Sequence, residues 1–279
     1  MTLNDAIVAA TAQLKNSSPT PALDAQVLLA HSLGQDRTYV IAHARDDLDT
    51  DTQKRFEQLV TKRLGGTPVA YLTGKQEFWS LPIMVTVDTL IPRPETELLV
   101  ELALEKIPEY ENSSILDIGT GSGAIAIAIA NERENASVVA SDSSAQAIEV
   151  AMRNANQLEL DNIKFVEGAT FDPLVNKIFD LVVSNPPYVP ENDPHLTQGD
   201  VRFEPRSALA AGHDGLDVIR QIVEQAIDYL VPQGWLMIEH GYDQESAVEK
   251  LFERAGFEEI ECYRDLSGQP RVTIGRRPL

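Results

Sequence analysis

The feature that most constrains the fold is an alternation of strand and helix patterns that begins near residue 113. Short apolar runs typical of buried strands alternate with longer stretches of helical periodicity. Strands are expected over 114–118, 136–141, 163–166, 179–184, 235–240, 257–263 and 271–275, and helices over 123–131, 145–158, 216–230 and 244–255. Such alternation predicts an α/β domain with a mostly parallel sheet covered on both faces, which binds ligands at the carboxyl ends of its strands.

The chain before this region has a different pattern. Residues 1–75 show helical periodicity, and Thr20-Pro21 is a typical helix start, with Thr20 as the N-cap. Leu3, Ile7, Val8 and Leu14 are expected on one apolar helix face. The predicted organisation is a helical bundle over 1–75, a β-hairpin connector over 76–91 and the α/β domain over 92–279.

The run from Ala124 to Ala130, A-I-A-I-A-I-A, allows two interpretations. It alternates at period two, as in a strand, but a glycine turn precedes it and a clear strand follows, which favours a helix. The run is too short to cross a bilayer. The N-terminus carries an early acid and lacks the basic region of a signal peptide. A cytoplasmic protein without a membrane segment is expected.

The charge balance limits the partners of this chain. It has 43 acidic and 23 basic side chains and a net charge of −20, which argues against stable nucleic-acid binding through a broad basic surface. The negative charge either keeps the protein soluble or steers a partner with a basic segment. The single cysteine, Cys262, excludes an intrachain disulfide, and the histidines show no metal-ligand spacing. No metal site is expected.

A glycine-rich loop follows the first strand of the α/β region. Its sequence, D-I-G-T-G-S-G, spans 117–123 and differs from the G-x-G-x-x-G pattern of dinucleotide folds. Glycines allow a tight turn and a close approach to a ligand. A cofactor-binding role is therefore expected for the five loop residues Gly119, Thr120, Gly121, Ser122 and Gly123.

An acid ends the next strand. The carboxylate of Asp142 can accept hydrogen bonds from both hydroxyls of a ribose. Alternatively, it caps the helix that follows Ser143-Ser144. The nearby glycine loop favours ribose binding.

The sequence S-N-P-P-Y, residues 184–188, stops the fourth strand abruptly because proline cannot extend a sheet. The side-chain oxygen of Asn185 and the carbonyl of Pro186 are rigid acceptors for the two hydrogens of an –NH₂ group. Tyr188 offers a flat face to a planar group, and Pro187 completes the substrate-binding stretch. The predicted substrate is an amide or a nucleobase.

Together these motifs resemble the Rossmann-like S-adenosylmethionine-dependent methyltransferases that act on planar nitrogen. Further motifs resemble the N5-glutamine methyltransferases of peptide chain release factors, the PrmC or HemK family. These motifs are G-T-P-V-A-Y-L-T-G (66–74), E-F-W (77–79), T-L-I-P-R-P-E-T-E (89–97), R-F-E-P (202–205) and A-L (208–209).

The resemblance implies a seven-stranded class I methyltransferase sheet with S-adenosylmethionine as cofactor and S-adenosylhomocysteine as product. The implied substrate is the glutamine of the Gly-Gly-Gln loop in class I bacterial release factors, docked with help from the N-terminal helices. Asn185, Pro186 and Tyr188 are the implied catalytic residues, and Asn185 also contacts the cofactor. Where the family often has an acid and an aromatic residue near adenine, this chain has Ala169 and Thr170. Adenine contacts are expected from Thr170, with Glu167, Phe171 or backbone groups as alternatives.

Two other functions remain open at the level of sequence. A DNA or RNA amino-methyltransferase would use the same N-P-P-Y chemistry on an exocyclic amine, although the net charge argues against it. A non-catalytic binding module with this fold would not need the glycine loop, Asp142 and Asn185 together.

Overall fold

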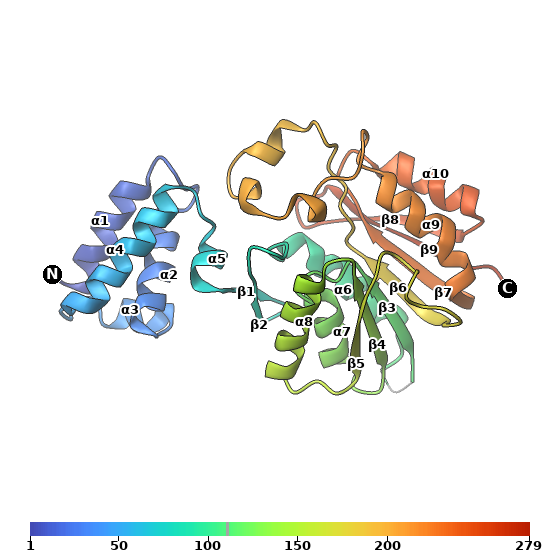
Figure 1. Cartoon of the computed structure of the whole chain (residues 1–279), viewed down its shortest axis with the longest axis horizontal. Coiled ribbons are helices and arrows are strands. Elements are labelled where there is room, and N and C mark those ends of the chain that lie inside the picture. The colour runs from blue at the N-terminus through green and yellow to red at the C-terminus, as the bar shows by residue number, and fades with distance from the viewer. Residues whose placement is uncertain (110–111) are drawn as a thin grey trace. The chain divides into compact units, whose positions relative to one another are not determined.

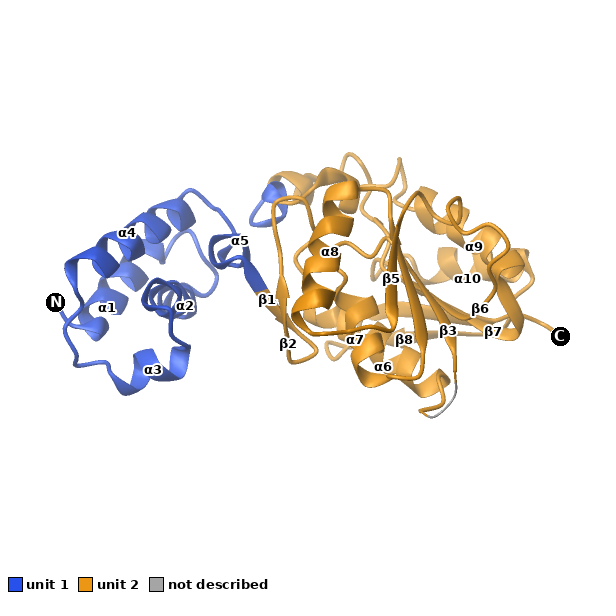
Figure 2. Cartoon of the chain, turned by 60° about the horizontal axis from the view of Figure 1, so that its bottom comes forward, with its two compact units in different colours: residues 1–75, 198–203 blue, residues 76–197, 204–279 orange. Residues whose placement is uncertain are grey.

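The computed structural model describes residues 1–109 and 112–279. The chain divides into two compact units, coloured separately in Figure 2. The first unit comprises Met1–Lys75 together with Gln198–Phe203, and the second comprises Gln76–Thr197 and Glu204–Leu279. The short segment 198–203 therefore belongs with the helical unit, which no sequence pattern indicated.

The first unit is helical. Its helices are α1 (Leu3–Leu14), α2 (Pro21–Leu33), α3 (Arg37–Ala42), α4 (Thr50–Leu64) and α5 (Val69–Thr73). A reciprocal capping box between Thr2 and Asp5 starts α1, and the Asp49 carboxylate accepts two backbone N–H bonds at the start of α4. These caps satisfy donors that the first turn of a helix leaves unpaired.

A buried ion pair lies inside this unit. The guanidinium of Arg63, on α4, donates from Nε to Asp24 of α2 at 2.7 Å and from Nη1 to Asp200 at 2.6 Å. The Arg63 side chain is only 3% exposed. One arginine thus joins two helices and the 198–203 segment.

The second unit begins at Gln76, within β1 (Lys75–Phe78), which forms a two-stranded hairpin with β2 (Leu81–Met84). The short helix η1 (Pro94–Thr96) then leads into α6 (Glu97–Lys106). The buried side chain of Asn154 accepts from the Met84 N–H at 2.8 Å and donates to the carbonyls of Met84 and Ser122. This amide ties the hairpin to the glycine loop.

The main sheet has seven strands in the order β5-β4-β3-β6-β7-β9-β8. The strands are β3 (Ser114–Ile118), β4 (Ser137–Asp142), β5 (Ile163–Glu167), β6 (Phe179–Ser184), β7 (Leu230–Glu239), β8 (Glu258–Arg264) and β9 (Pro270–Arg276). The strands β3 to β7 are parallel, while β9 is antiparallel to both of its neighbours. The predicted α/β fold with a mostly parallel, seven-stranded sheet is confirmed.

Helices cover both faces of this sheet. Figure 1 shows α6, α7 (Ala124–Glu132) and α8 (Ala145–Gln157) on one side, and α9 (Asp217–Tyr229) and α10 (Glu245–Ala255) on the other. Every residue from Ala124 to Ala130 is buried, so the A-I-A-I-A-I-A run is the predicted helix, apolar all round. Across the described ranges, no helix combines the length and the apolar character needed to span a bilayer.

The strand register explains how distant residues meet at one edge. Ile118, the last residue of β3, pairs with Ser141 of β4 and with Ser184 of β6, and Ser184 pairs in turn with Ile238 of β7. The next residues along these strands therefore lie side by side at the carboxyl edge: Asp142, Gly119, Asn185 and Glu239. Strand order reverses between β3 and β6, which is where open α/β sheets bind ligands.

Candidate active site

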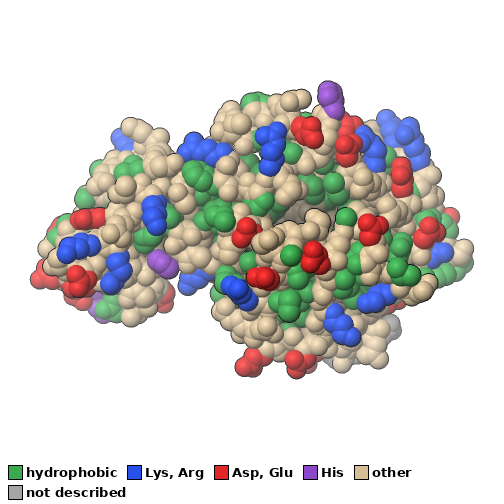
Figure 3. Space-filling model, in the orientation of Figure 1, with side chains coloured by type: hydrophobic (Ala, Val, Ile, Leu, Met, Phe, Trp, Pro, Cys, Tyr) green, Lys and Arg blue, Asp and Glu red, His purple; other side chains and the backbone are tan. Residues whose placement is uncertain are grey.

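A pocket lies at this carboxyl edge, within the second unit. The surface of the second unit is visibly hollowed in Figure 3. Six of the residues singled out from the sequence line the pocket: Gly119, Gly121, Asp142, Thr170, Asn185 and Pro187. Cofactor and substrate candidates from four different strand ends are thus brought into one cavity.

The glycines of the loop divide into two kinds. Gly119 (φ 71°) and Gly121 (φ 56°) have left-handed backbones, and the space where a Cβ would project is open at both. At Gly123, by contrast, a Cβ would come within 2.8 Å of the Ile127 side chain and 3.1 Å of Ala151 Cβ. Gly119 and Gly121 therefore allow a ligand to approach the backbone, whereas Gly123 allows α7 to pack closely.

The two hydroxyl residues of the loop face inward. Thr120 is buried and donates from Oγ1 to Oδ2 of the buried Asp117 at 2.7 Å, and Ser122 is also buried. Burial raises the pKa of Asp117 to about 7, and its Oδ1 lacks a hydrogen-bond partner among the described residues. Thr120 and Ser122 thus shape the loop from below and do not line the pocket.

Asp142 braces the pocket wall. Its Oδ2 accepts the backbone N–H of Gly121 at 2.9 Å, and its Oδ1 accepts that of Ser144 at 2.9 Å. The side chain of Ser144, rather than that of Asp142, caps α8 by accepting from Ala147 N–H. Each carboxylate oxygen has two lone pairs, so Asp142 keeps acceptor capacity for two ligand hydroxyls.

The segment after β5 forms another part of the wall. Gly168, Ala169 and Thr170 line the pocket, and Thr170 adopts a left-handed backbone (φ 43°) that threonine rarely takes. Phe171 is fully buried and stacks on Tyr229, with ring centroids 4.4 Å apart. Phe171 therefore faces the core. The residues after β5 that reach the pocket, Gly168, Ala169 and Thr170, have small side chains or none.

The N-P-P-Y stretch splits in the same way. Asn185 and Pro187 line the pocket, whereas Pro186 is buried and Tyr188 packs against the hydrophobic core. The Asn185 amide donates from Nδ2 to Thr96 Oγ1 at 3.1 Å. The Tyr188 hydroxyl donates to Glu239 Oε1 at 3.4 Å. The rings of Pro186 and Tyr188 thus do not line the pocket.

Glu239 is a charged group that the sequence analysis did not single out. It is 1% exposed, and burial raises its pKa to about 7 against the opposing effects of a hydrogen bond from Thr96 and the charge of Arg271. Burial likewise raises the pKa of Tyr188, so its phenol stays protonated. A signal for Glu239 was present, because it ends an apolar strand as Asp142 does.

The raised pKa of Glu239 predicts a pH-dependent stability. The folded protein holds this proton more tightly than the unfolded chain, so the free energy of unfolding falls as pH rises from about 4.5 to about 7. Glu239→Gln removes the titrating group. Between pH 5 and pH 8 the wild type is expected to lose about 3 kcal/mol more than the variant in urea unfolding.

Asp117 contributes the same sign in both proteins, so the difference between them isolates Glu239. Equal pH dependence in the wild type and the variant would show that Glu239 titrates normally.

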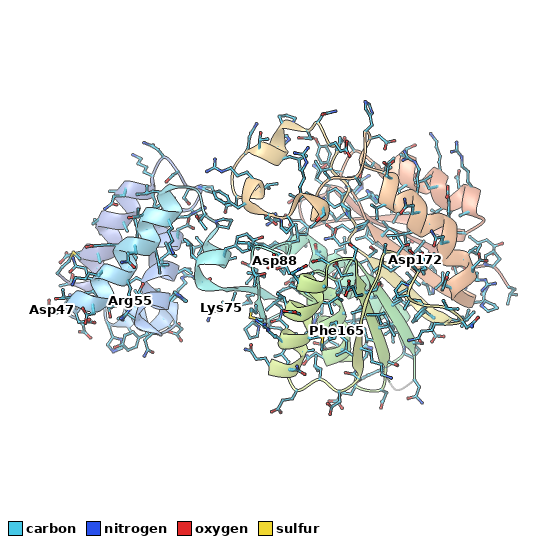
Figure 4. All side chains as sticks on the ribbon, in the orientation of Figure 1. Asp47, Arg55, Lys75, Asp88, Phe165 and Asp172 are labelled. Carbon is cyan, nitrogen blue, oxygen red and sulfur yellow. The ribbon has the colours of Figure 1, made fainter. Side chains whose placement is uncertain are left out.

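Two further chain segments complete the pocket. The first segment is residues 88–90, and the second is residues 205–208 without Arg206. Val218 and Gln221 of α9 also line the pocket. Figure 4 labels Asp88, in the first of these segments, and Phe165, which lies in β5. The buried Glu204, which precedes the second segment, connects it to the first. Its carboxylate accepts the Ile91 N–H at 3.1 Å and forms an ion pair with Arg93.

No group of three or more His, Cys, Asp or Glu side chains that could hold a metal ion is present in the described part of the chain.

Comparison with known proteins gives matches along most of the chain. A family model described as the PrmC N-terminal domain matches residues 5–74, and one described as the methyltransferase small domain matches residues 95–200. The release factor glutamine methyltransferase of Vibrio cholerae is 47% identical over 99% of this chain and 97% of its own length. That of Escherichia coli is 45% identical over 93% of this chain and 94% of its own.

Solved structures share the fold at low identity. A methyltransferase from Pyrococcus furiosus matches with a TM-score of 0.55 and 18% identity, over 71% of this chain and 90% of its own. A ribosomal protein L11 methylase from Lactobacillus delbrueckii matches with a TM-score of 0.51 and 20% identity, over 69% and 82% of the two chains.

Proposed function

Because the chain belongs to the release factor glutamine methyltransferase family, we propose that it methylates the side-chain amide nitrogen (N5) of a release-factor glutamine. The methyl donor is S-adenosylmethionine, and the glutamine is that of the Gly-Gly-Gln loop in class I factors. The observation that carries this proposal is the meeting of Gly119, Asp142 and Asn185 in one pocket.

The residues present suit this cofactor. Gly119 and Gly121 leave room for a ligand against the backbone, and Asp142 has lone pairs for both ribose hydroxyls. Thr170 and the neighbouring backbone form the wall available to the adenine. S-adenosylmethionine supplies an electrophilic methyl group on a sulfonium ion and leaves as S-adenosylhomocysteine.

Asn185 and Pro186 hold the substrate amide in this proposal. Their oxygens accept the two N–H bonds of the glutamine carboxamide and direct its nitrogen at the methyl carbon, while Tyr188 supports the stretch from the core side. As the N–C bond forms, the S–C bond breaks, and the methylated nitrogen then releases one proton to water. Positioning of this kind contributes up to about 7–11 kcal/mol in well-aligned reactions.

The proposal needs no side-chain base. Tyr188 has a raised pKa and stays protonated, so it does not accept the proton. An amide nitrogen that has taken up a methyl group is strongly acidic and loses its proton without help.

The remaining parts of the chain take supporting roles. The helical region 1–75 docks the release factor, and the hairpin 76–91 connects it to the α/β domain. That domain, residues 92–279, carries out the methyl transfer, and the protein acts in the cytoplasm. On the face shown in Figure 3, Lys and Arg side chains are scattered among acidic ones. That face has no broad basic surface of the kind that nucleic acid needs.

Asp142→Ala is expected to weaken cofactor binding. It removes the acceptors for the ribose hydroxyls, so the dissociation constant of S-adenosylmethionine rises about 10–100-fold in calorimetry. Ser144→Ala serves as a control, because it loosens the helix cap at the same pocket wall and leaves the Asp142 carboxylate and its bond to Gly121 N–H in place. An unchanged constant in the Asp142 variant would disprove the ribose assignment.

The proposed function is tested with labelled cofactor. The protein is incubated with an unmethylated class I release factor, with the same factor carrying alanine in place of the loop glutamine, and with bare DNA. Label is expected only in the first sample. Label in DNA would assign an amino-methyltransferase of nucleic acid, and cofactor binding without any transfer would assign a non-catalytic module.

A further inference from the structure

We infer that Thr96 and Glu239 are positioning residues that orient the Asn185 amide so that its oxygen Oδ1, and not its NH₂ group, faces the substrate. This inference rests on the proposed function, in which Asn185 must accept a hydrogen bond from the substrate nitrogen.

The backbone brings these residues together. Glu239 ends β7 beside β6, and the pairing of Ser184 with Ile238 places Glu239 next to Asn185. Thr96 ends η1 and is 3% exposed, while Glu239 is 1% exposed. Three segments that are distant in sequence thus form one polar cluster at the pocket wall.

The hydrogen-bond directions in this cluster are determined by proton counting. At pH 8, above its raised pKa of about 7, the Glu239 carboxylate is ionised and only accepts. It accepts the Tyr188 hydroxyl proton and attracts that of Thr96, whose hydroxyl opposes the rise of this pKa. A threonine hydroxyl has one proton, so Thr96 has only lone pairs left for Asn185. The Asn185 Nδ2 donates to Thr96 Oγ1 at 3.1 Å, as this count requires.

This fixed direction decides what the substrate meets. Asn185 lines the pocket, and with Nδ2 bound to Thr96 its oxygen is the end that remains for the ligand. In the reversed orientation Oδ1 would face the Thr96 oxygen with no proton between them. The NH₂ group of Asn185 would then face the NH₂ group of the substrate, which is a donor against a donor.

A carboxylate is required for this count. A glutamine at 239 has its own NH₂ group, which can donate to Thr96 Oγ1 and free the threonine proton for Asn185 Oδ1. The neighbouring groups that act on Glu239 are Arg271, Tyr188 and Glu95. Of these, Arg271 favours the ionised form and Glu95 opposes it.

Single-turnover methylation of a release factor at pH 8 tests the inference. Thr96→Val removes the hydroxyl with little change in shape. The rate of methyl transfer is expected to fall about tenfold or more, because the Asn185 NH₂ group loses its buried hydrogen-bond partner. Thr96→Ser keeps the hydroxyl and is expected to stay within about threefold of the wild-type rate. Glu239→Gln is expected to lower the rate of methyl transfer by about the same factor as Thr96→Val. The dissociation constant of S-adenosylmethionine changes little in all three.

A double-mutant cycle separates positioning from a structural role. In an Asn185→Ala background Thr96→Val is expected to cost nothing further, because Thr96 acts only through Asn185. Thr273→Val is the matched control: Thr273 is a buried threonine of the same sheet that bonds His240, and its loss should leave the rate per folded protein unchanged.

The outcomes are distinguishable. A wild-type rate in folded Thr96→Val, or an equal cost of that change with and without Asn185, overturns the inference and leaves the proposed function intact. Absence of label in the release factor with wild-type protein overturns both.

Discussion

Asn185→Ala is expected to lower the rate constant of methyl transfer by about 10²–10³-fold, because it removes a prealigned acceptor from the reacting nitrogen. Asn185 lines the pocket at the end of β6, held from behind by Thr96. The contacts expected for the ribose come from β4, so the dissociation constant of S-adenosylmethionine is expected to change by no more than about threefold. Single-turnover kinetics and calorimetry measure the two quantities separately.

The size of the effect distinguishes Asn185 from its support. Thr96→Val leaves the acceptor present but unoriented, so it is expected to cost less than Asn185→Ala. A parallel loss of cofactor affinity and rate would contradict the substrate role and indicate that Asn185 mainly shapes the cofactor site. A rate close to wild type would remove Asn185 from the reaction altogether.

The parts of this site that the sequence predicts are those written in local patterns. Glycines after a strand, an acid at a strand end and a Pro-Pro stop are visible within a few residues. Parallel pairing then brings the carboxyl ends of these strands together. In this protein Ile118 pairs with both Ser141 and Ser184, so the residues that follow them lie side by side. The fold and the family were predictable because these signals are strong and agree with each other.

The parts that the sequence does not predict depend on long-range contacts. Residues 88–90, and those of 205–208 other than Arg206, line the pocket. Glu204 holds these two segments together by binding Ile91 and Arg93, and no periodicity in the sequence predicts such a long-range pair. Thr96 lies in a recognisable motif, but its role depends on meeting Asn185 and Glu239 in space. Local patterns thus give the residue types at the site and not their hydrogen-bond directions.

The helical unit shows a different limit of periodicity. In α1 the buried face includes Ala6 and Ala10, whereas Val8, which was expected on the apolar face, is 60% exposed. Small alanines allow close helix packing, and a pattern weighted by side-chain size misses them. Similarly, Thr20 begins α2 as expected, but its hydroxyl donates to Asp24 instead of capping the helix.

Arg63→Met is expected to destabilise the helical unit by about 3–5 kcal/mol, because it leaves a buried charge without its partner. Asp24 has a side chain only 8% exposed and depends on the Arg63 guanidinium at 2.7 Å. Hydrogen bonds from the hydroxyls of Ser18 and Thr20 to Asp24 remain, but they supply no opposite charge. Urea unfolding of the full chain, followed by circular dichroism, measures the change.

The chain offers a matched control on the same helix. Arg55, labelled in Figure 4, is exposed and donates to Thr52 Oγ1 and to the Ser32 carbonyl, so Arg55→Met is expected to cost under about 1 kcal/mol. Combining Arg63→Met with Asp24→Leu removes the stranded charge and is expected to restore much of the stability. Limited proteolysis adds a second readout, because the loss of Arg63 also frees Asp200 and exposes the 198–203 segment to cleavage. Equal effects of Arg63→Met and Arg55→Met, with the segment still protected, would mean that helix packing alone holds this unit together and that the buried ion pair adds nothing to it.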